Sequence, residues 1–122
     1  MNEEIKSYRD LIVWQKSIGL VVEIYQITKH FPKEELYGLT IQIRRCAISI
    51  PSNISEGRGR GTRKDFAQFL RIALGSANEL QTQIEIAKRL NYIQENKKTN
   101  ELLIEIIKML NSMINKLNFP NS

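Results

Sequence analysis

The sequence has one cysteine and one histidine among its 122 residues, and this scarcity excludes several kinds of site. Cys46 alone cannot form a disulfide within the chain, and its place on an apolar helical face indicates a buried thiol. His30 follows Lys29 at the end of a predicted helix. One histidine and one cysteine are too few for a zinc site or a Cys–His nucleophile pair. We therefore predict neither a bound metal nor a cofactor.

Long apolar runs are also missing, since no stretch approaches the ~18 residues that suggest a membrane-spanning helix. The first ten residues, MNEEIKSYRD, lack the features of a secretory signal peptide. We therefore expect a cytoplasmic protein that does not contact membranes. The length of 122 residues and the apolar share of 42% predict a single globular domain over residues 1–122.

Positive charge is concentrated in the middle of the sequence. Residues 40–75 carry seven basic and two acidic side chains, an excess that equals the net charge of +5 of the whole chain. Most of these cations are arginines, whose planar guanidinium groups suit phosphates and carboxylates. The basic candidates for binding a nucleic acid are Arg44, Arg45, Arg58, Arg60, Arg63 and Lys64. This concentration indicates an anionic partner such as RNA or DNA.

Apolar residues recur every three or four positions along four segments, and none alternates as a strand does. The pattern predicts helices over residues 10–30, 33–56, 62–90 and 95–117, joined by short connections. Such a chain is typical of an all-α, antiparallel up-down-up-down four-helix bundle. Pro51 predicts a kink in the second helix because proline removes a backbone donor. Gly57 is expected to cap the end of that helix.

The first two predicted helices each have two apolar stripes, although a bundle helix in a monomer needs only one. The stripes of the first helix are Leu11, Trp14, Ile18, Val21, Tyr25 and Thr28, and Val13, Leu20, Ile24 and Ile27. The second helix has an additional stripe of Tyr37, Ile41 and Ile48. A wide stripe in a compact bundle would explain this pattern, and so would burial against another subunit. We favour a homo-oligomer because proteins seldom leave an extended apolar face in water.

The glycine-rich segment GRGRGTRK, residues 57–64, separates the second and third predicted helices. Its spacing does not fit a P-loop, and a dinucleotide fingerprint would require glycine in place of Thr62 after a strand. Thr62 and Asp65 resemble a capping box at the start of the third helix. Backbone N–H groups there could bind a phosphate. The segment is either an anion-binding site or a solvated connector, and both interpretations stay open.

Side chains suited to catalysis are few. Glu56 and Glu79 could form a general acid pair only if the fold brings them close together. A simpler role is in a structural polar network, within the bundle or between subunits, formed by Asn53, Glu56, Ser76 and Glu79. We therefore predict a protein that is not an enzyme and has no catalytic residue.

Three stretches carry a resemblance to a known family: DLIVWQKS (10–17), FPKEELYGLTIQIRRCAISIPSNISEGRGR (31–60) and FLRIALGSANELQTQIEIAKRLNYI (69–93). They are similar to the four-helix-bundle proteins encoded by intervening sequences within bacterial 23S ribosomal RNA genes. Cys46 and Ser55 stand where alanine is frequent in that family, and neither replaces a charged residue.

The resemblance implies an antiparallel four-helix bundle that associates as a ring-shaped homopentamer. A similar family serves as an accessory to the reverse transcriptase of diversity-generating retroelements, where basic surfaces are implicated in nucleic-acid and polymerase binding. By that analogy the basic candidates contact RNA or DNA. Two hypotheses stay open: a non-enzymatic oligomer that binds RNA or DNA, and a structural or protein-binding scaffold. In the scaffold, arginines such as Arg44 and Arg45 would contact other subunits or a protein partner.

Overall fold

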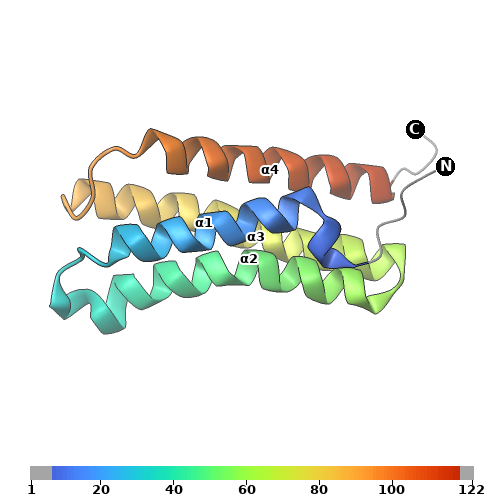
Figure 1. Ribbon diagram of the computed structural model, residues 1–122, viewed down its shortest axis with the longest axis horizontal. Coiled ribbons are helices and arrows are strands. Elements are labelled where there is room, and N and C mark those ends of the chain that lie inside the picture. Colours follow the sequence, from blue (N-terminus) through green and yellow to red (C-terminus); the bar gives the residue numbers. More distant parts are fainter. Residues whose placement is uncertain (1–6, 119–122) are drawn as a thin grey trace.

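The computed structural model describes residues 7–118, which form helices and turns and contain no strand. Four long helices lie side by side: α1 (Ile12–Thr28), α2 (Ile41–Arg60), α3 (Arg63–Arg89) and α4 (Lys97–Asn118) (Figure 1). Short helices precede α1 and α2, namely η1 (Tyr8–Asp10), η2 (Lys33–Glu35) and η3 (Leu36–Thr40). The turn between α2 and α3 lies at one end, and the other two connections lie at the opposite end (Figure 1). The predicted all-α four-helix fold is confirmed.

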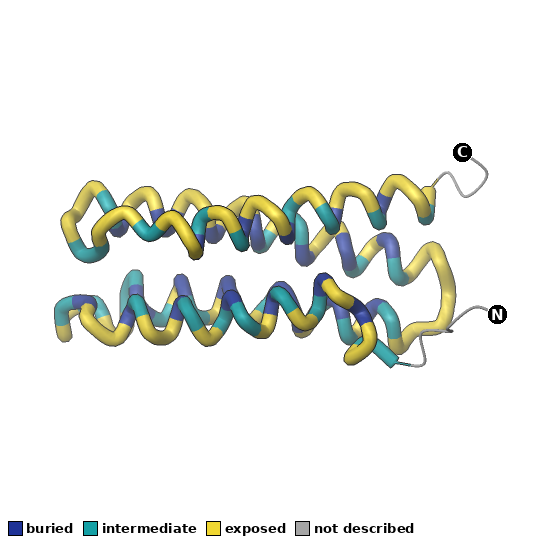
Figure 2. Tube along the Cα trace, turned by 45° about the horizontal axis from the view of Figure 1, so that its top comes forward, coloured by how far each residue is buried: buried dark blue, intermediate teal, exposed yellow. Residues whose placement is uncertain are grey.

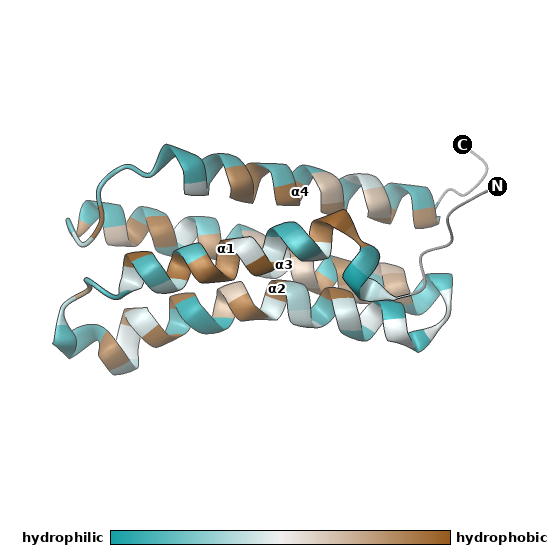
Figure 3. Cartoon of the chain, in the orientation of Figure 1, coloured by the Kyte–Doolittle hydropathy of each residue, from teal (hydrophilic) through white to brown (hydrophobic). Residues whose placement is uncertain are grey.

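The core lies where the inner faces of the four helices meet (Figure 2). Its largest fully buried aliphatic side chains are Val13, Leu20, Ile24, Ile43, Ile50, Ile54, Leu70, Leu80, Leu103, Ile106 and Leu110. Val13, Leu20 and Ile24 of one predicted stripe therefore enter the core, and so do Leu11 and Thr28 at the two ends of the other stripe. Ile18 and Tyr25 of the other stripe are 38% and 40% exposed. Apolar residues recur along α1 in Figure 3.

The predicted second helix is interrupted near its start. Gly38 has non-helical backbone angles, with φ −113° and ψ −112°, inside the π-helical segment η3. The Glu35 carboxylate accepts a hydrogen bond from the Leu39 N–H at 3.2 Å. A Cβ at Gly38 would lie 2.9 Å from that carboxylate, so glycine leaves room for the cap. α2 continues through Pro51, and the kink expected there stays a prediction.

The expectation that Gly57 caps α2 is wrong. Gly57 lies inside α2, where a Cβ would come within 2.5 Å of the Phe69 Cβ on α3. The missing side chain thus lets α3 approach closely, and α2 ends at Gly61, whose φ of +86° suits glycine. Thr62 then caps α3, because its Oγ1 accepts a hydrogen bond from the Asp65 N–H at 3.1 Å.

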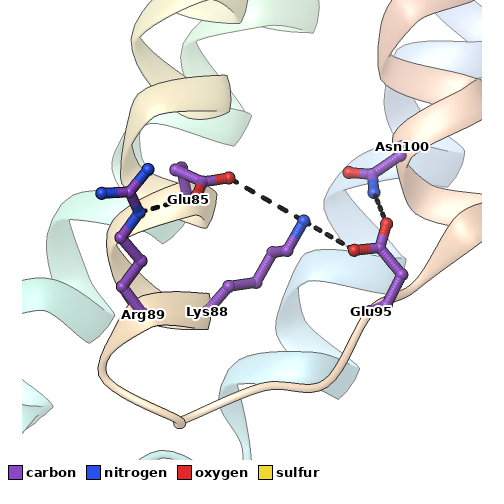
Figure 4. A network of polar contacts seen from close by, with 5 residues as sticks. All are labelled: Glu85, Lys88, Arg89, Glu95 and Asn100. Carbon is purple, nitrogen blue, oxygen red and sulfur yellow. Dashed lines mark hydrogen bonds and ion pairs between the residues drawn. The ribbon is translucent and has the colours of Figure 1, made fainter.

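The connection between α3 and α4 is held by an ion-pair network (Figure 4). Lys88 Nζ lies 2.7 Å from Glu95 Oε1 and 3.8 Å from Glu85 Oε1. Asn100 donates a hydrogen bond to the other oxygen of Glu95 at 2.7 Å. The hydrogen bond from Lys88 is the main cause that lowers the pKa of Glu95, followed by the Lys88 charge. The network therefore anchors the start of α4 to the end of α3.

A second contact joins the two connections at this end of the bundle. The hydroxyl of Tyr92 donates a hydrogen bond to Glu35 Oε2 at 2.8 Å, and this bond raises the pKa of Tyr92. The Tyr92 ring also packs against Phe31, with 5.5 Å between the ring centroids. Glu35 thus serves both the start of α2 and the loop after α3.

Candidate nucleic-acid interface

The structure divides the six basic candidates into two separate groups. Arg44 and Arg45 lie in the first half of α2, whereas Arg58, Arg60, Arg63 and Lys64 surround its turn into α3. Arg45 and Arg58 are separated by roughly 20 Å along the helix, at about 1.5 Å per residue. One phosphate group cannot contact both groups at once, so each group is considered as its own surface.

The group at the turn is enlarged by residues from α4. Arg63 Nη2 donates a hydrogen bond to the backbone oxygen of Lys116 at 3.3 Å, and Arg71 donates one to Asn118 Oδ1 at 3.0 Å. These contacts place the last turn of α4 beside the start of α3. We call this surface the basic end and define it as Arg58, Arg60, Arg63, Lys64, Arg71 and Lys116. The local charge cluster did not reveal Lys116, because α4 reaches this place only through the fold.

The basic end combines exposed cations with the N-terminus of a long helix. Arg60, Arg63 and Lys64 are exposed, and Arg58 is half-buried. Arg60 lies over the Phe69 ring at 5.0 Å and pairs with Glu56 at 3.0 Å. Because the first N–H groups of a helix and its dipole favour anions, α3 adds to the attraction of these cations for phosphate. This arrangement can bind a phosphate backbone without reading its sequence.

Arg44 and Arg45 have a more apolar setting. Arg44 donates from Nε to Thr28 Oγ1 at 2.9 Å, and its guanidinium lies 4.5 Å from the centre of the Tyr25 ring. Arg45 is exposed, and neither arginine makes an ion pair within residues 7–118. Both line a hollow of about 350 Å³ with Tyr25, Leu36, Tyr37, Thr40, Ile41 and Ile48.

A second hollow of about 300 Å³ follows the same pair of helices and shares Ile48 with the first. It is lined by Tyr8, Trp14, Ile18, Val21, Ile48, Pro51, Ser52 and Ser55. We call the two hollows together the outer groove. Its walls are the surplus apolar stripes of α1 and α2, so its chemistry suits a protein surface better than a phosphate backbone.

The predicted polar network is joined through a residue that sequence reasoning did not include. Ser49 Oγ lies 2.8 Å from Ser76 Oγ, and Asn53 Nδ2 donates to Ser49 Oγ at 2.9 Å and to its backbone oxygen at 2.8 Å. Ser49 thus connects Asn53 on α2 with Ser76 on α3. Glu56 is not joined to them by these bonds, since its carboxylate pairs with Arg60.

Glu79 enters this region through Cys46. The Cys46 thiol lies 3.0 Å from the backbone oxygen of Ser76 and 3.6 Å from Glu79 Oε1. Burial, with a further contribution from the Glu79 charge, raises the pKa of Cys46 to about 12. Because the thiolate is the nucleophilic form, this cysteine is held in its unreactive state.

Within residues 7–118, no three side chains of His, Cys, Asp or Glu gather where they could hold a metal ion. None of the helices in that part of the chain has an apolar stretch long enough to cross a membrane.

Comparison with known proteins agrees with this architecture. Residues 9–112 match the family described as 23S rRNA-intervening sequence protein. A crystal structure of a protein of unknown function from the S23 ribosomal protein family of Bacteroides thetaiotaomicron is similar, with a TM-score of 0.78 and 34% sequence identity. The similarity covers 85% of this chain and 96% of that one. No curated protein matches the sequence. The chain belongs to the 23S rRNA-intervening sequence protein family.

Proposed function

We propose that the protein is a non-enzymatic homo-oligomer, a ring of five subunits, that binds RNA or DNA through its basic end. The observation that carries the nucleic-acid part is the convergence of cations from α2, α3 and α4 at the N-terminus of α3. Residues 40–75 contain only two carboxylates, Glu56 and Asp65, to oppose them. Residues 56–71 carry five cations against these two carboxylates, which leaves a net charge of +3 to attract phosphates.

Oligomerisation would strengthen this binding. One basic end offers a few exposed cations, whose contacts with phosphates are individually weak. In an oligomer several basic ends contact the same strand, so that later contacts form at a high effective concentration. The exposed apolar walls of the outer groove support association, since such a face is rarely left in water.

Binding should be electrostatic and only weakly dependent on base sequence. Among residues 7–118, Phe66 and Phe69 lie beside the basic end, and both are half-buried rather than free to stack on bases. Each phosphate neutralised on a single strand contributes about 0.7 to the slope of log affinity against log salt. A fluorescence anisotropy titration of a labelled single-stranded RNA at several salt concentrations measures this slope.

The decisive variant replaces Arg58, Arg60, Arg63 and Lys64 with alanine. It should bind the RNA more weakly and with a flatter salt dependence. A matched control removes four exposed cations from the other end of the bundle, Lys29, Lys33, Lys97 and Lys98, and changes the net charge equally. If both variants lose RNA affinity equally, the effect is one of overall charge. If the variant of Arg58, Arg60, Arg63 and Lys64 binds RNA as well as the unaltered protein, the basic end is removed from the proposal.

A scaffold that binds protein is the second candidate, and the setting of Arg44 and Arg45 favours it. Both arginines line an apolar hollow and stand apart from the basic end. In that case Arg45→Ala should weaken the oligomer in light scattering, and the purified protein should carry no nucleic acid. The ratio of absorbance at 260 nm to that at 280 nm separates the two candidates before any titration.

A further inference from the structure

We propose that the outer groove of one subunit receives the exposed face of α3 from a second copy, and that Arg45 pairs with Glu79 across this contact. The inference rests on the proposed homo-oligomer and names the surfaces and the ion pair that would build it. It assigns Arg45 to assembly and leaves nucleic-acid binding to the basic end.

The first surface is a stripe on α3 that faces away from the core. Its members recur at alternating steps of three and four, which is the spacing of a helix seam: Ile72, Gly75, Glu79, Thr82 and Ile86. Ile72 and Ile86 are 44% and 45% exposed. A Cβ at Gly75 would meet nothing within 4 Å, so the stripe is uncovered at this position. We call it the α3 stripe.

The second surface is the outer groove, whose centre is formed by α2. Ile41, Arg45 and Ile48 follow one another at steps of four and three. Ile48 is 40% exposed and lines both hollows of the groove. The two hollows, of about 300 and 350 Å³, are large enough to take apolar side chains from a neighbouring helix.

The charges of the two surfaces are complementary. Arg45 stands between two isoleucines of α2, and Glu79 stands midway between Ile72 and Ile86. Within residues 7–118 neither makes an ion pair, and the one hydrogen-bond contact of Glu79 is the Cys46 thiol at 3.6 Å. A charge covered by an apolar contact is costly unless an opposite charge meets it. Pairing Arg45 with Glu79 satisfies both.

In this proposal the contact is heterologous: the groove of each subunit takes the α3 stripe of the next, rather than two subunits exchanging both surfaces about a two-fold axis. A heterologous contact generates a ring when its rotation closes. Both surfaces run along the sides of the bundle, so the contact leaves the basic end uncovered for a nucleic acid.

Charge reversal tests this pairing. Arg45→Glu and Glu79→Arg alone should each place like charges in the contact and weaken association at least tenfold, as measured by sedimentation velocity across a concentration series. The double variant Arg45→Glu/Glu79→Arg restores opposite charges and should regain the mass of the unaltered protein. Lys108→Glu and Glu101→Arg, which reverse exposed charges on α4, serve as matched controls and should keep that mass. Circular dichroism spectra check that each variant is folded.

The possible results separate this interface from the proposed oligomer. If the unaltered protein sediments as a single subunit, the oligomer fails and this contact fails with it. If it is oligomeric and both single reversals keep its mass, the oligomer stands and this contact is overturned. Dissociation of the single variants without recovery in the double variant overturns the Arg45–Glu79 pair. A lower melting temperature at unchanged mass means that the two residues interact within one subunit, which also overturns it.

Discussion

A Cβ on Gly57 would lie 2.5 Å from the Cβ of Phe69, closer than two carbon atoms can pack, so this glycine sets how closely α2 and α3 approach. Gly57→Ala should therefore destabilise the protein. Alanine gains about 1 kcal/mol in helix propensity, but overpacking a tight contact typically costs about 1–3 kcal/mol. We expect a net loss of up to about 2 kcal/mol in the free energy of unfolding, measured by urea titration.

Gly59→Ala is the matched control for this substitution. A Cβ at Gly59 meets nothing within 4 Å, and the residue is exposed in the last turn of the same helix. We expect this variant to be unchanged or stabilised by up to about 1 kcal/mol. If both glycine variants shift stability in the same direction, the close approach at Gly57 is not what matters.

Thr40 and Thr99 are both buried, yet their hydroxyl groups differ in their partners. Thr40 Oγ1 is buried and has no hydrogen-bond partner among residues 7–118, whereas Thr99 Oγ1 donates to Glu23 Oε1 at 2.7 Å. Valine has nearly the shape of threonine but no hydroxyl. Thr40→Val should therefore stabilise the fold by about 1–2 kcal/mol, and Thr99→Val should destabilise it by about 1.5–3 kcal/mol. Thermal and urea unfolding should show that the two substitutions change stability in opposite directions. A lower stability of both variants would contradict the prediction.

Cys46 should resist thiol reagents in the folded protein. With the pKa raised from 9.0 to about 12, the thiolate fraction at pH 8 is lowered roughly 1,000-fold relative to an ordinary thiol, and burial blocks access further. The reaction with a chromogenic disulfide should be slow in buffer and rapid in denaturing urea. A variant that carries Cys46→Ala and Ser112→Cys, with the thiol at an exposed position of α4, should react rapidly in both. Rapid reaction of the native Cys46 would mean that the α2–α3 contact opens easily.

The Lys88–Glu95 ion pair should make stability depend on acid pH. The pKa of Glu95 is lowered in the folded state from 4.5, so the pair stabilises the protein above that value and is lost as the pH falls through the lowered pKa. Glu95→Gln should reduce stability at pH 7 and make its decline between pH 5 and pH 3 shallower. Urea midpoints measured across this range would show it.

The exposed pair of Lys97 with Glu101, at 3.9 Å, provides the comparison for that experiment. Exposed ion pairs of this kind contribute little to stability, so Glu101→Gln should leave the pH profile nearly unchanged. Equal effects of the two substitutions would argue against a special role for the network around Lys88.

Much of the fold could be predicted because helical periodicity is a local property. Leu70, Ala73, Ala77 and Leu80 recur at steps of three and four, and the structure buries all of them. The cap at Thr62 also depends only on residues that are adjacent in sequence. Gly57 was misassigned because a glycine that ends a helix and one that permits a close contact look the same until the second helix is in place.

The candidate site was less accessible to sequence reasoning. The charge count located the arginines. The packing of α4 beside α3 brings Lys116 next to Arg63, which the sequence does not show. Arg45 and Arg58 lie on the same helix, α2, but too far apart along it to form one site. Ser49 was not included in the polar network, because a serine on a helix gives no sign of its partner across the bundle.

Four helices, each with an apolar face, and the concentration of positive charge in the middle of the chain follow from the order of the residues alone. Helical periodicity and local charge can both be read from short stretches of the sequence without knowledge of the fold. Only the packed fold shows that Leu20 and Ile24 lie in the core, whereas Trp14, Ile18 and Tyr25 of the other stripe wall the outer groove. Both stripes are apolar and follow the same spacing. Which of them is buried therefore depends on the side chains of α2, α3 and α4 that pack against α1, and the local pattern of α1 does not contain this information.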